Sequence, residues 1–315
     1  MRLYPFSMFG IVLFLLPAIL FSQDQDVSMA ISKGRLSGSF RMAEEGNKVL
    51  PTVVFVSGSG PTDRNGNQPM GGSNAIGQLA DSLAQLGISS LRFDKRGIGE
   101  SQLSDMSEEA LLLDTFVYDL IAWIDYLSKE QSTDVILAGH SEGALVATLA
   151  AQRHSSVVGI ITLAGAGRTA DSLMIQQFQR QPAFVAVAAD SLFRQLREGL
   201  PIQAPPFLQG LFRPSILPYL SSWIKFDPAA ELGKLDMPVL VVSGDADLQV
   251  FAEDADRLNE AARQGDLLVF TQMNHVLKSV TSPADNMASY TDSHRPNYPG
   301  LATAIYHWIF TKYSK

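Results

Sequence analysis

The chain has 315 residues, of which 46% are hydrophobic and 18% are charged, and this balance excludes a disordered chain, a collagen-like repeat and a membrane protein with many spans. The formal net charge of −8 argues against a nucleic-acid-binding protein, because phosphate contacts need clustered Lys and Arg. With no cysteine and only five histidines, the chain offers few ligands for a metal, so its chemistry must come from hydroxyls, carboxylates and imidazoles.

The first 22 residues predict a targeting segment. Residues 3–22 carry no charge, residues 8–21 form a nearly continuous apolar run behind Arg2, and the acidic sequence QDQD follows at 23–26. This arrangement predicts a signal peptide at residues 1–22 and export to the periplasm or the medium. The alternative is an uncleaved membrane anchor, since the uncharged stretch is close to bilayer length.

From residue 52 onward, short apolar runs alternate with segments of helical periodicity. Strands that are apolar throughout are typical of a parallel sheet covered on both faces, so we expect an α/β fold with a mostly parallel central sheet flanked by helices. In such sheets the ligand site lies beyond the carboxyl ends of the strands. The predicted strands are 52–57, 88–93, 134–139, 157–163, 238–243 and 267–270, and the predicted helices are 75–86, 114–127, 144–152, 253–262 and 301–310.

Residues 167–236 interrupt the alternation because they contain no strand candidate and are divided by prolines. We expect a helical cap inserted into a core formed by residues 23–166 and 237–315. Part of the cap's aromatic side chains should pack it onto the core, and the rest should line an apolar chamber above the strand ends. These aromatic residues are Phe178, Phe184, Phe193, Phe207, Phe212, Trp223 and Phe226.

Residues 139–143 (GHSEG) form the pattern G-x-S-x-G between a predicted strand and a predicted helix. A sharp strand–turn–helix needs the two glycines because a Cβ at either position would collide with neighbouring backbone. Such a turn presents the central hydroxyl at a helix N-terminus, where backbone N–H groups favour developing negative charge. The pattern predicts that Ser141 is a nucleophile, and the alternative is a tight turn with only a structural role.

A serine nucleophile needs a base and a third group that orients the base. The strand at 238–243 ends in two candidate acids, Asp245 and Asp247, and we favour Asp247 because it lies farther into the loop. His275 follows the next predicted strand and therefore reaches the same sheet edge, so we expect it to be the base. His140 is adjacent to the nucleophile, but its side chain should point away around the turn.

The oxyanion formed by serine attack requires backbone N–H donors. One should be the amide of Glu142, directly after the nucleophile, and the other should come from the glycine-rich loop after the first core strand, where we choose Ser59. The polar residues 62–67 continue this loop. They either frame the substrate entrance or form a hydrogen-bonded surface turn.

Taken together, these segments resemble the α/β-hydrolase superfamily, and in particular its serine-aminopeptidase-like and bacterial carboxylesterase branch. That family places its acid at the last position of G-x-x-D, which is Asp247 here. Ser57-Gly58 stands where proline iminopeptidases usually have His-Gly, and this favours the carboxylesterases. The matching segments are SGSGPTDRNGN (57–67), FDKRGIGES (93–101), AGHSEGA (138–144), LAGAGR (163–168), PVLVVSGDADLQV (238–250) and MNH (273–275).

We therefore expect a serine hydrolase that cleaves carboxylic esters with short or medium acyl groups. Its partner is a small-molecule ester, it needs no metal or organic cofactor, and it should have no membrane span once the leader is removed. One alternative is an aminopeptidase, in which cap carboxylates such as Glu198 or Asp227 would hold the substrate's ammonium group. Another is a binding protein that keeps the fold without catalysis, although an intact serine, acid and histidine argue against it.

Overall fold

The computed structural model describes residues 24–44, 50–69, 71–131 and 133–314. The predicted signal peptide at residues 1–22 lies outside these residues and stays a prediction. Within the described ranges, no helix is both long enough and apolar enough to cross a membrane.

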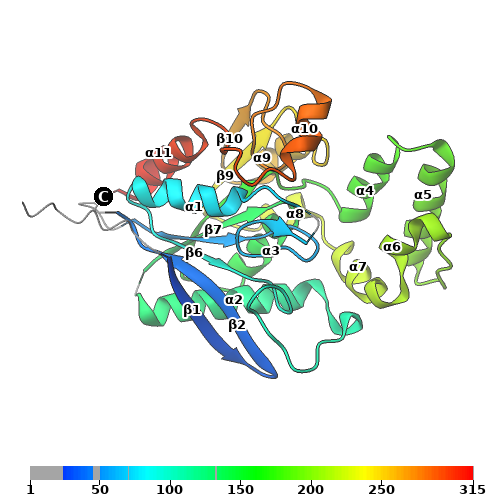
Figure 1. The fold of residues 1–315 in the computed structure, drawn as a ribbon, viewed down its shortest axis with the longest axis horizontal. Helices are drawn as coiled ribbons and strands as arrows, with labels where there is room; N and C mark the ends of the chain where they lie inside the picture. Colours follow the sequence, from blue (N-terminus) through cyan, green and yellow to red (C-terminus); the bar gives the residue numbers. More distant parts are fainter. Residues whose placement is uncertain (1–23, 45–49, 70, 132, 315) are drawn as a thin grey trace, which may run out of the picture.

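Eight strands form one twisted sheet in the order β1-β2-β6-β3-β7-β8-β9-β10 (Figure 1). All neighbouring pairs from β6 to β10 are parallel, as the apolar strand sequences predict. The carboxyl ends of these strands therefore meet at one edge of the sheet. The parallel strands are β3 (Thr52–Val56), β6 (Ser90–Phe93), β7 (Val135–His140), β8 (Val157–Leu163), β9 (Pro238–Gly244) and β10 (Gln264–Phe270).

An antiparallel hairpin, β1 (Asp24–Ile31) and β2 (Gly34–Arg41), extends the sheet next to β6. The apolar-run criterion misses this hairpin because both strands are rich in polar and small residues. β1 lies at the exposed edge, where polar side chains are favoured because they discourage pairing with other chains. Gly38 in β2 lies so close to the next strand that a Cβ there would be 2.6 Å from the Arg92 carbonyl oxygen.

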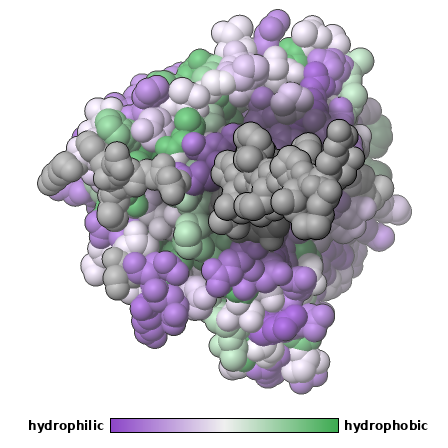
Figure 2. Space-filling model, turned by 60° about the vertical axis from the view of Figure 1, so that its left-hand side comes forward, coloured by the Kyte–Doolittle hydropathy of each residue, from purple (hydrophilic) through white to green (hydrophobic). Residues whose placement is uncertain are grey.

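Surface residues on the face shown in Figure 2 are mostly hydrophilic, with hydrophobic residues in small groups between them. Ion pairs lie on the surface as well, for example between Arg153 and Asp114 and between Arg295 and Asp285. A mixed surface of this kind is ordinary for a folded globular protein.

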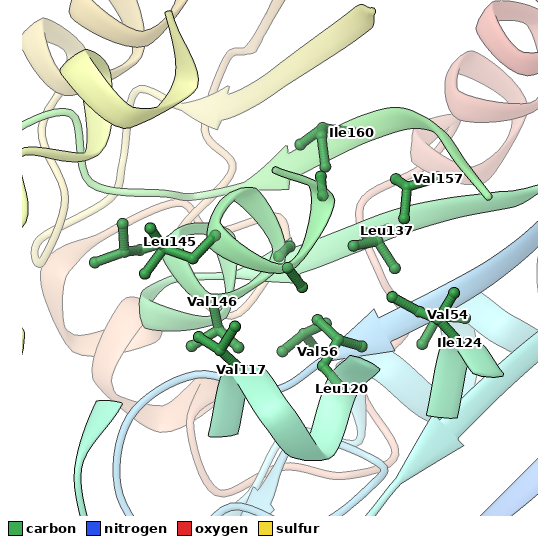
Figure 3. Packing of buried hydrophobic residues seen from close by; sticks show 14 of the residues in the cluster. Val54, Val56, Val117, Leu120, Ile124, Leu137, Leu145, Val146, Val157 and Ile160 are labelled. Carbon is green, nitrogen blue, oxygen red and sulfur yellow. The ribbon is translucent and has the colours of Figure 1, made fainter. Parts of the chain in front are cut away.

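Helices cover both faces of the sheet. One hydrophobic cluster packs the sheet against α2 (Leu113–Glu130), α3 (Glu142–Ala151) and α9 (Ala252–Ala261), and the other packs it against α1 (Ala75–Gln85) and α11 (Leu301–Tyr313). Figure 3 shows the first cluster, in which strand side chains meet those of α2 and α3. Its labelled members are Val54, Val56, Leu137, Val157 and Ile160 from the strands, and Val117, Leu120, Ile124, Leu145 and Val146 from the helices.

The segment between β8 and β9 is helical, and Figure 1 shows α4 to α7 to one side of the sheet. These helices share a hydrophobic cluster of their own around Phe193 and Phe212. The last helix of the segment, α8, packs on α3 and α9 and contributes Ala229 and Leu232 to the core cluster. The helices are α4 (Ala170–Phe178), α5 (Ala183–Glu198), α6 (Gln209–Phe212), α7 (Leu217–Trp223) and α8 (Pro228–Leu232); the short strands β4 (Asn67–Gln68) and β5 (Gly71–Gly72) and the helix α10 (Pro283–Ser289) lie elsewhere.

Candidate active site

Ser141 lies in a strained turn between β7 and α3. Its φ of 53° and ψ of −121° fall in a region that residues with a side chain rarely adopt. Both flanking glycines are required, because a Cβ on Gly139 would be 2.3 Å from the Gly143 carbonyl oxygen and a Cβ on Gly143 would be 2.2 Å from the Val56 carbonyl oxygen. The turn places the Ser141 side chain at the N-terminus of α3, beyond the end of β7.

His275 and Asp247 are joined at the same edge of the sheet. His275 Nδ1 donates to Asp247 Oδ2 at 2.8 Å, and the two residues are only 4% and 7% exposed. The other carboxylate oxygen of Asp247 accepts the amides of Gln249 at 2.7 Å and Val250 at 3.0 Å, which fix the carboxylate in place. Asp245 is exposed, and its carboxylate accepts the amide of Gln272 instead.

Ser141 and His275 line one cavity of about 400 Å³, which we call the polar chamber. Among the described residues, no hydrogen bond joins the Ser141 hydroxyl to the His275 ring. Hydrogen bonds between a nucleophile and its base often tighten only in the substrate complex. The ring nitrogen opposite Nδ1 remains available for the serine proton, because the Asp247 bond uses Nδ1.

Two backbone amides next to Ser141 have no acceptor within the described part of the chain. They belong to Ser59, in the loop after β3, and to Glu142, the first residue of α3. Both residues line a second, smaller cavity together with Ser141. Unpaired N–H groups in the same cavity as a serine hydroxyl suit an oxyanion.

A buried lysine ties these two amide-bearing segments together. Lys95 Nζ donates to the Gly58 carbonyl oxygen at 2.5 Å and to Glu142 Oε1 at 3.0 Å. The side chains of Lys95 and Glu142 are only 6% and 1% exposed. Tyr219 lies beside this pair, and burial together with the Glu142 charge raises the pKa of its phenol well above the usual value.

The second cavity, of about 80 Å³, lies between the core and the helical segment, and we call it the apolar chamber. It shares Ser59, Ser141 and Gln249 with the polar chamber, so the two chambers meet at the serine. His275 lines only the polar chamber. The hydrophobic side chains of the apolar chamber include Leu145, Leu173, Met174, Trp223 and Val250.

Part of the sequence and the fold of the chain are similar to those of known proteins. Residues 71–214, which include Ser141, match the family model described as serine aminopeptidase, S33. Esterase EstD from Thermotoga maritima is 27% identical over 241 residues, or 75% of this chain, and the chain spans 56% of that relative's length. The structure of Est1E from Butyrivibrio proteoclasticus is similar, with a TM-score of 0.59 at 17% identity, over 92% of this chain and 99% of that one. The Pyrococcus furiosus esterase Pf2001 gives a TM-score of 0.54 at 17% identity, over 84% of this chain and 88% of that one. The chain has the α/β-hydrolase fold.

Within this fold, the residues chosen from the sequence come together at one sheet edge. Ser141 and His275 share a cavity, His275 is bonded to Asp247, and the Ser59 and Glu142 amides flank Ser141. The expectation for His140 was wrong. Its side chain does not point away, because Nε2 donates to the His275 carbonyl oxygen at 2.8 Å and its ring lies 4.9 Å from the His275 ring.

Burial, together with the neighbouring His275, lowers the pKa of His140 from 6.5 to about 4, so the ring is neutral at pH 7. The neutral ring bonds to the backbone of His275 and holds it in place. The sequence gives no sign of this contact, since the two histidines are 135 positions apart.

Most of the aromatic side chains of the helical segment pack rather than line a chamber. Phe178, Phe193 and Phe212 pack in the segment's own cluster, and Phe226 packs against the core. Phe184 and Phe207 form an exposed edge-to-face pair. Of the seven, Trp223 alone is among the described residues lining the apolar chamber.

The polar segment at residues 62–67 forms a hydrogen-bonded turn and also contributes residues to the lining of the polar chamber. Asp63 accepts the amides of Asn65 and Asn67 at 2.8 Å, which makes a hydrogen-bonded turn. Arg64 turns inward and pairs with Asp94 at 2.6 Å, while Thr62 and Gly66 line the polar chamber.

Proposed function

We propose that this α/β-hydrolase is a serine esterase that hydrolyses carboxylic esters with short acyl groups. The observation that carries the proposal is the placement of Ser141 at a strained turn, in the same chamber as an imidazole that a buried carboxylate holds through Nδ1. The similarity to esterase EstD supports the same reaction. The small volume of the apolar chamber favours short acyl groups.

Each group has one task in this reaction. Ser141 Oγ attacks the ester carbonyl carbon while His275 takes the hydroxyl proton, and Asp247 holds the imidazole in the required tautomer. The Ser59 and Glu142 amides stabilise the oxyanion of the tetrahedral intermediate. His275 then returns the proton to the departing alcohol oxygen, which leaves an acyl-enzyme. A water molecule, deprotonated by His275, cleaves the acyl-enzyme to a carboxylic acid and free Ser141.

Lys95 is the positioning residue of the oxyanion site. A trans peptide holds its C=O and N–H on opposite sides, so a cation bound to the Gly58 carbonyl oxygen turns the Ser59 N–H the other way. The same ammonium group holds the Glu142 side chain at the start of α3. One buried charge thereby fixes the relative placement of both donor segments.

The aminopeptidase alternative needs a carboxylate for the substrate's free ammonium, which is carried by the acyl part of such a substrate. Glu142 and Arg168 are the charged residues that line the apolar chamber, and Lys95 already neutralises Glu142. Neither expected carboxylate lines either chamber. Glu198 is exposed at the end of α5, and Asp227 caps α8 and pairs with Arg257 at 3.3 Å. An ammonium group would be unpaired beside Arg168, so the esterase is favoured.

A fluorophosphonate probe tests the proposal directly. Wild-type protein should be labelled on Ser141 and should hydrolyse p-nitrophenyl butyrate. Ser141→Ala should lose the label and at least about a thousandfold in kcat, because loss of a nucleophile removes the covalent route. The thermal midpoint of both proteins is the control for folding.

Three outcomes would contradict the proposal. Labelling at another serine or an active Ser141→Ala variant would overturn the mechanism. Folded wild-type protein that is neither labelled nor active would instead favour the non-catalytic binding protein. Cleavage of aminoacyl p-nitroanilides in preference to p-nitrophenyl esters would favour the aminopeptidase.

A further inference from the structure

The two chambers lie on opposite sides of Ser141 and can hold the two parts of an ester, the alcohol part and the acyl part. Which part each chamber holds follows from the proposed esterase mechanism. The group that protonates the departing alcohol must lie on the alcohol side of the carbonyl carbon. His275 lines the polar chamber and not the apolar one. The alcohol part of the substrate therefore lies in the polar chamber, and the acyl part lies in the apolar chamber.

The polar chamber is lined mainly by side chains that form hydrogen bonds. None of its described lining residues is an Asp, Glu, Lys or Arg, and Val276 is the sole aliphatic side chain larger than glycine among them. A charged alcohol would have no partner in such a chamber, and a hydrocarbon would strip water from many polar groups. Besides Ser141, the hydroxyl and amide groups come from Ser59, Thr62, Gln68, Ser73, Gln249, Tyr290 and Thr291.

Hydrogen-bonding capacity in the chamber is left unused by the protein. Ser73 is only 3% exposed, it lines the chamber, and its hydroxyl has no hydrogen-bond partner among the described residues. The Tyr290 hydroxyl accepts from Gln249 Nε2 at 3.1 Å and has no acceptor for its own proton within the same residues. Burial raises the pKa of Tyr290 to about 12, so this phenol keeps a proton to donate. Buried polar groups normally have partners, and unused ones in a cavity point to a polar ligand.

We propose that the polar chamber binds the alcohol part of the ester through several hydroxyl groups, and that this alcohol is a neutral monosaccharide or a polyol of similar size. A sugar hydroxyl both donates and accepts, as do the hydroxyl groups of Ser73 and Tyr290, while Thr291, whose Oγ1 donates to the Ala288 carbonyl oxygen at 3.3 Å, can still accept. The volume of about 400 Å³ lies within the range of small-molecule sites and exceeds what a simple short alcohol fills.

A matched pair of substrates tests this proposal. 6-O-butyryl glucose and cyclohexylmethyl butyrate share the acyl group, a primary ester and a six-membered ring, and differ in the ring oxygen and hydroxyls. We expect kcat/KM to be at least about tenfold higher for the glucose ester, because each hydrogen bond to a neutral group contributes roughly a two- to tenfold preference. Butyrylcholine, whose alcohol carries a fixed positive charge, should be the poorest of the three.

Isosteric variants identify the groups responsible. Tyr290→Phe and Thr291→Val each remove one hydroxyl and should lower the preference for the glucose ester over the cyclohexylmethyl ester by roughly three- to tenfold. Thr311→Val makes the same change on the exposed side of α11 and is the control, because it should leave the preference as it is in wild type.

The possible results separate this inference from the esterase proposal. If p-nitrophenyl butyrate is hydrolysed while the cyclohexylmethyl or choline ester is cleaved as well as the glucose ester, the inference is wrong and the esterase stands. The inference is also wrong, and the esterase again stands, if the two chamber variants keep the wild-type preference. If p-nitrophenyl butyrate is not hydrolysed and Ser141 is not labelled, both fail together.

Discussion

A carboxylate can orient an imidazole only if it is itself held, and the two acids after β9 differ in this respect. Asp247 is buried, receives two backbone amides and reaches His275, whereas Asp245 is exposed and reaches the amide of Gln272. Asp247→Asn should therefore lower kcat by about a thousandfold or more, since an amide at this position favours the wrong imidazole tautomer. Asp245→Asn, the matched control two residues away, should keep kcat within about twofold of wild type, because Asn can still accept the Gln272 amide.

Steady-state kinetics with p-nitrophenyl butyrate measures both variants. A larger loss in Asp245→Asn than in Asp247→Asn would show that the wrong acid has been assigned. Equal, small losses would show that His275 acts without a carboxylate partner.

A residue's role can be predicted from the sequence when the pattern that reveals it lies in neighbouring residues. Ser141 was predictable because the turn around it needs glycines at fixed positions, and His275 and Asp247 because each follows a predicted strand of one parallel sheet. His140 and Lys95 were not predictable as site residues, because their roles depend on partners 37 to 135 positions away in the chain. Only the packed fold brings those partners together.

At the scale of helices and strands, Lys95 links the loop after β3 to the start of α3 through its bonds to the Gly58 carbonyl oxygen and to the Glu142 carboxylate. Mutations can remove these two bonds separately. Removing Lys95 alone would leave the buried Glu142 carboxylate without a counter-charge, and the loss of one partner of a buried ion pair typically destabilises a protein by about 3–5 kcal/mol. Glu142→Gln keeps the Lys95 bond to the Gly58 carbonyl oxygen and the backbone donor of residue 142, but it leaves the buried Lys95 charge without a carboxylate, so its thermal midpoint is measured together with its kcat. The double variant Lys95→Met, Glu142→Gln removes that bond without leaving an unpaired charge.

We expect Glu142→Gln to keep most of the wild-type kcat. The double variant Lys95→Met, Glu142→Gln should have a kcat about 10- to 100-fold below that of Glu142→Gln, with KM nearly unchanged. The loss falls on kcat because the Ser59 amide binds the oxyanion in the transition state rather than the substrate carbonyl in the ground state. A second double variant, Lys95→Arg with Glu142→Gln, should recover part of the rate, since Arg can donate to the same carbonyl. If Lys95→Met, Glu142→Gln raises KM while kcat stays constant, Lys95 has no part in the oxyanion site.

The helices and strands that could be predicted are likewise those that their own sequence specifies, and those that depend on contacts with distant segments could not be predicted. The parallel strands are continuous apolar runs and were predicted within a few residues of their observed bounds, because both of their faces are buried. The β1–β2 hairpin was missed, since its pairing partner β6 rather than its own polar sequence holds it in the sheet. The helices between β8 and β9 were predicted as a group, but the packing of α8 on α3 and α9 follows from contacts that the sequence does not reveal.

At the scale of the whole molecule, the lowered pKa of His140 makes the free energy of unfolding depend on pH. Burial and the nearby His275 lower its pKa from 6.5 to about 4 in the folded protein, and unfolding restores the ordinary value. Between these two values the unfolded chain binds more protons than the folded one, so the free energy of unfolding falls as the pH falls through this window. The contribution is fully present above pH 6.5 and is lost by about pH 4.

Urea unfolding at about pH 6.5 and about pH 4.5 measures this contribution. Wild type should lose about 2 kcal/mol more than His140→Gln between the two pH values, since each pH unit inside the window corresponds to about 1.4 kcal/mol for one proton. His294→Gln, at an exposed loop position, is the matched control and should follow the wild-type dependence. A His140→Gln protein that loses as much stability as wild type would show that the His140 ring is protonated in the folded state, and the neutral contact with the His275 backbone would have to be abandoned.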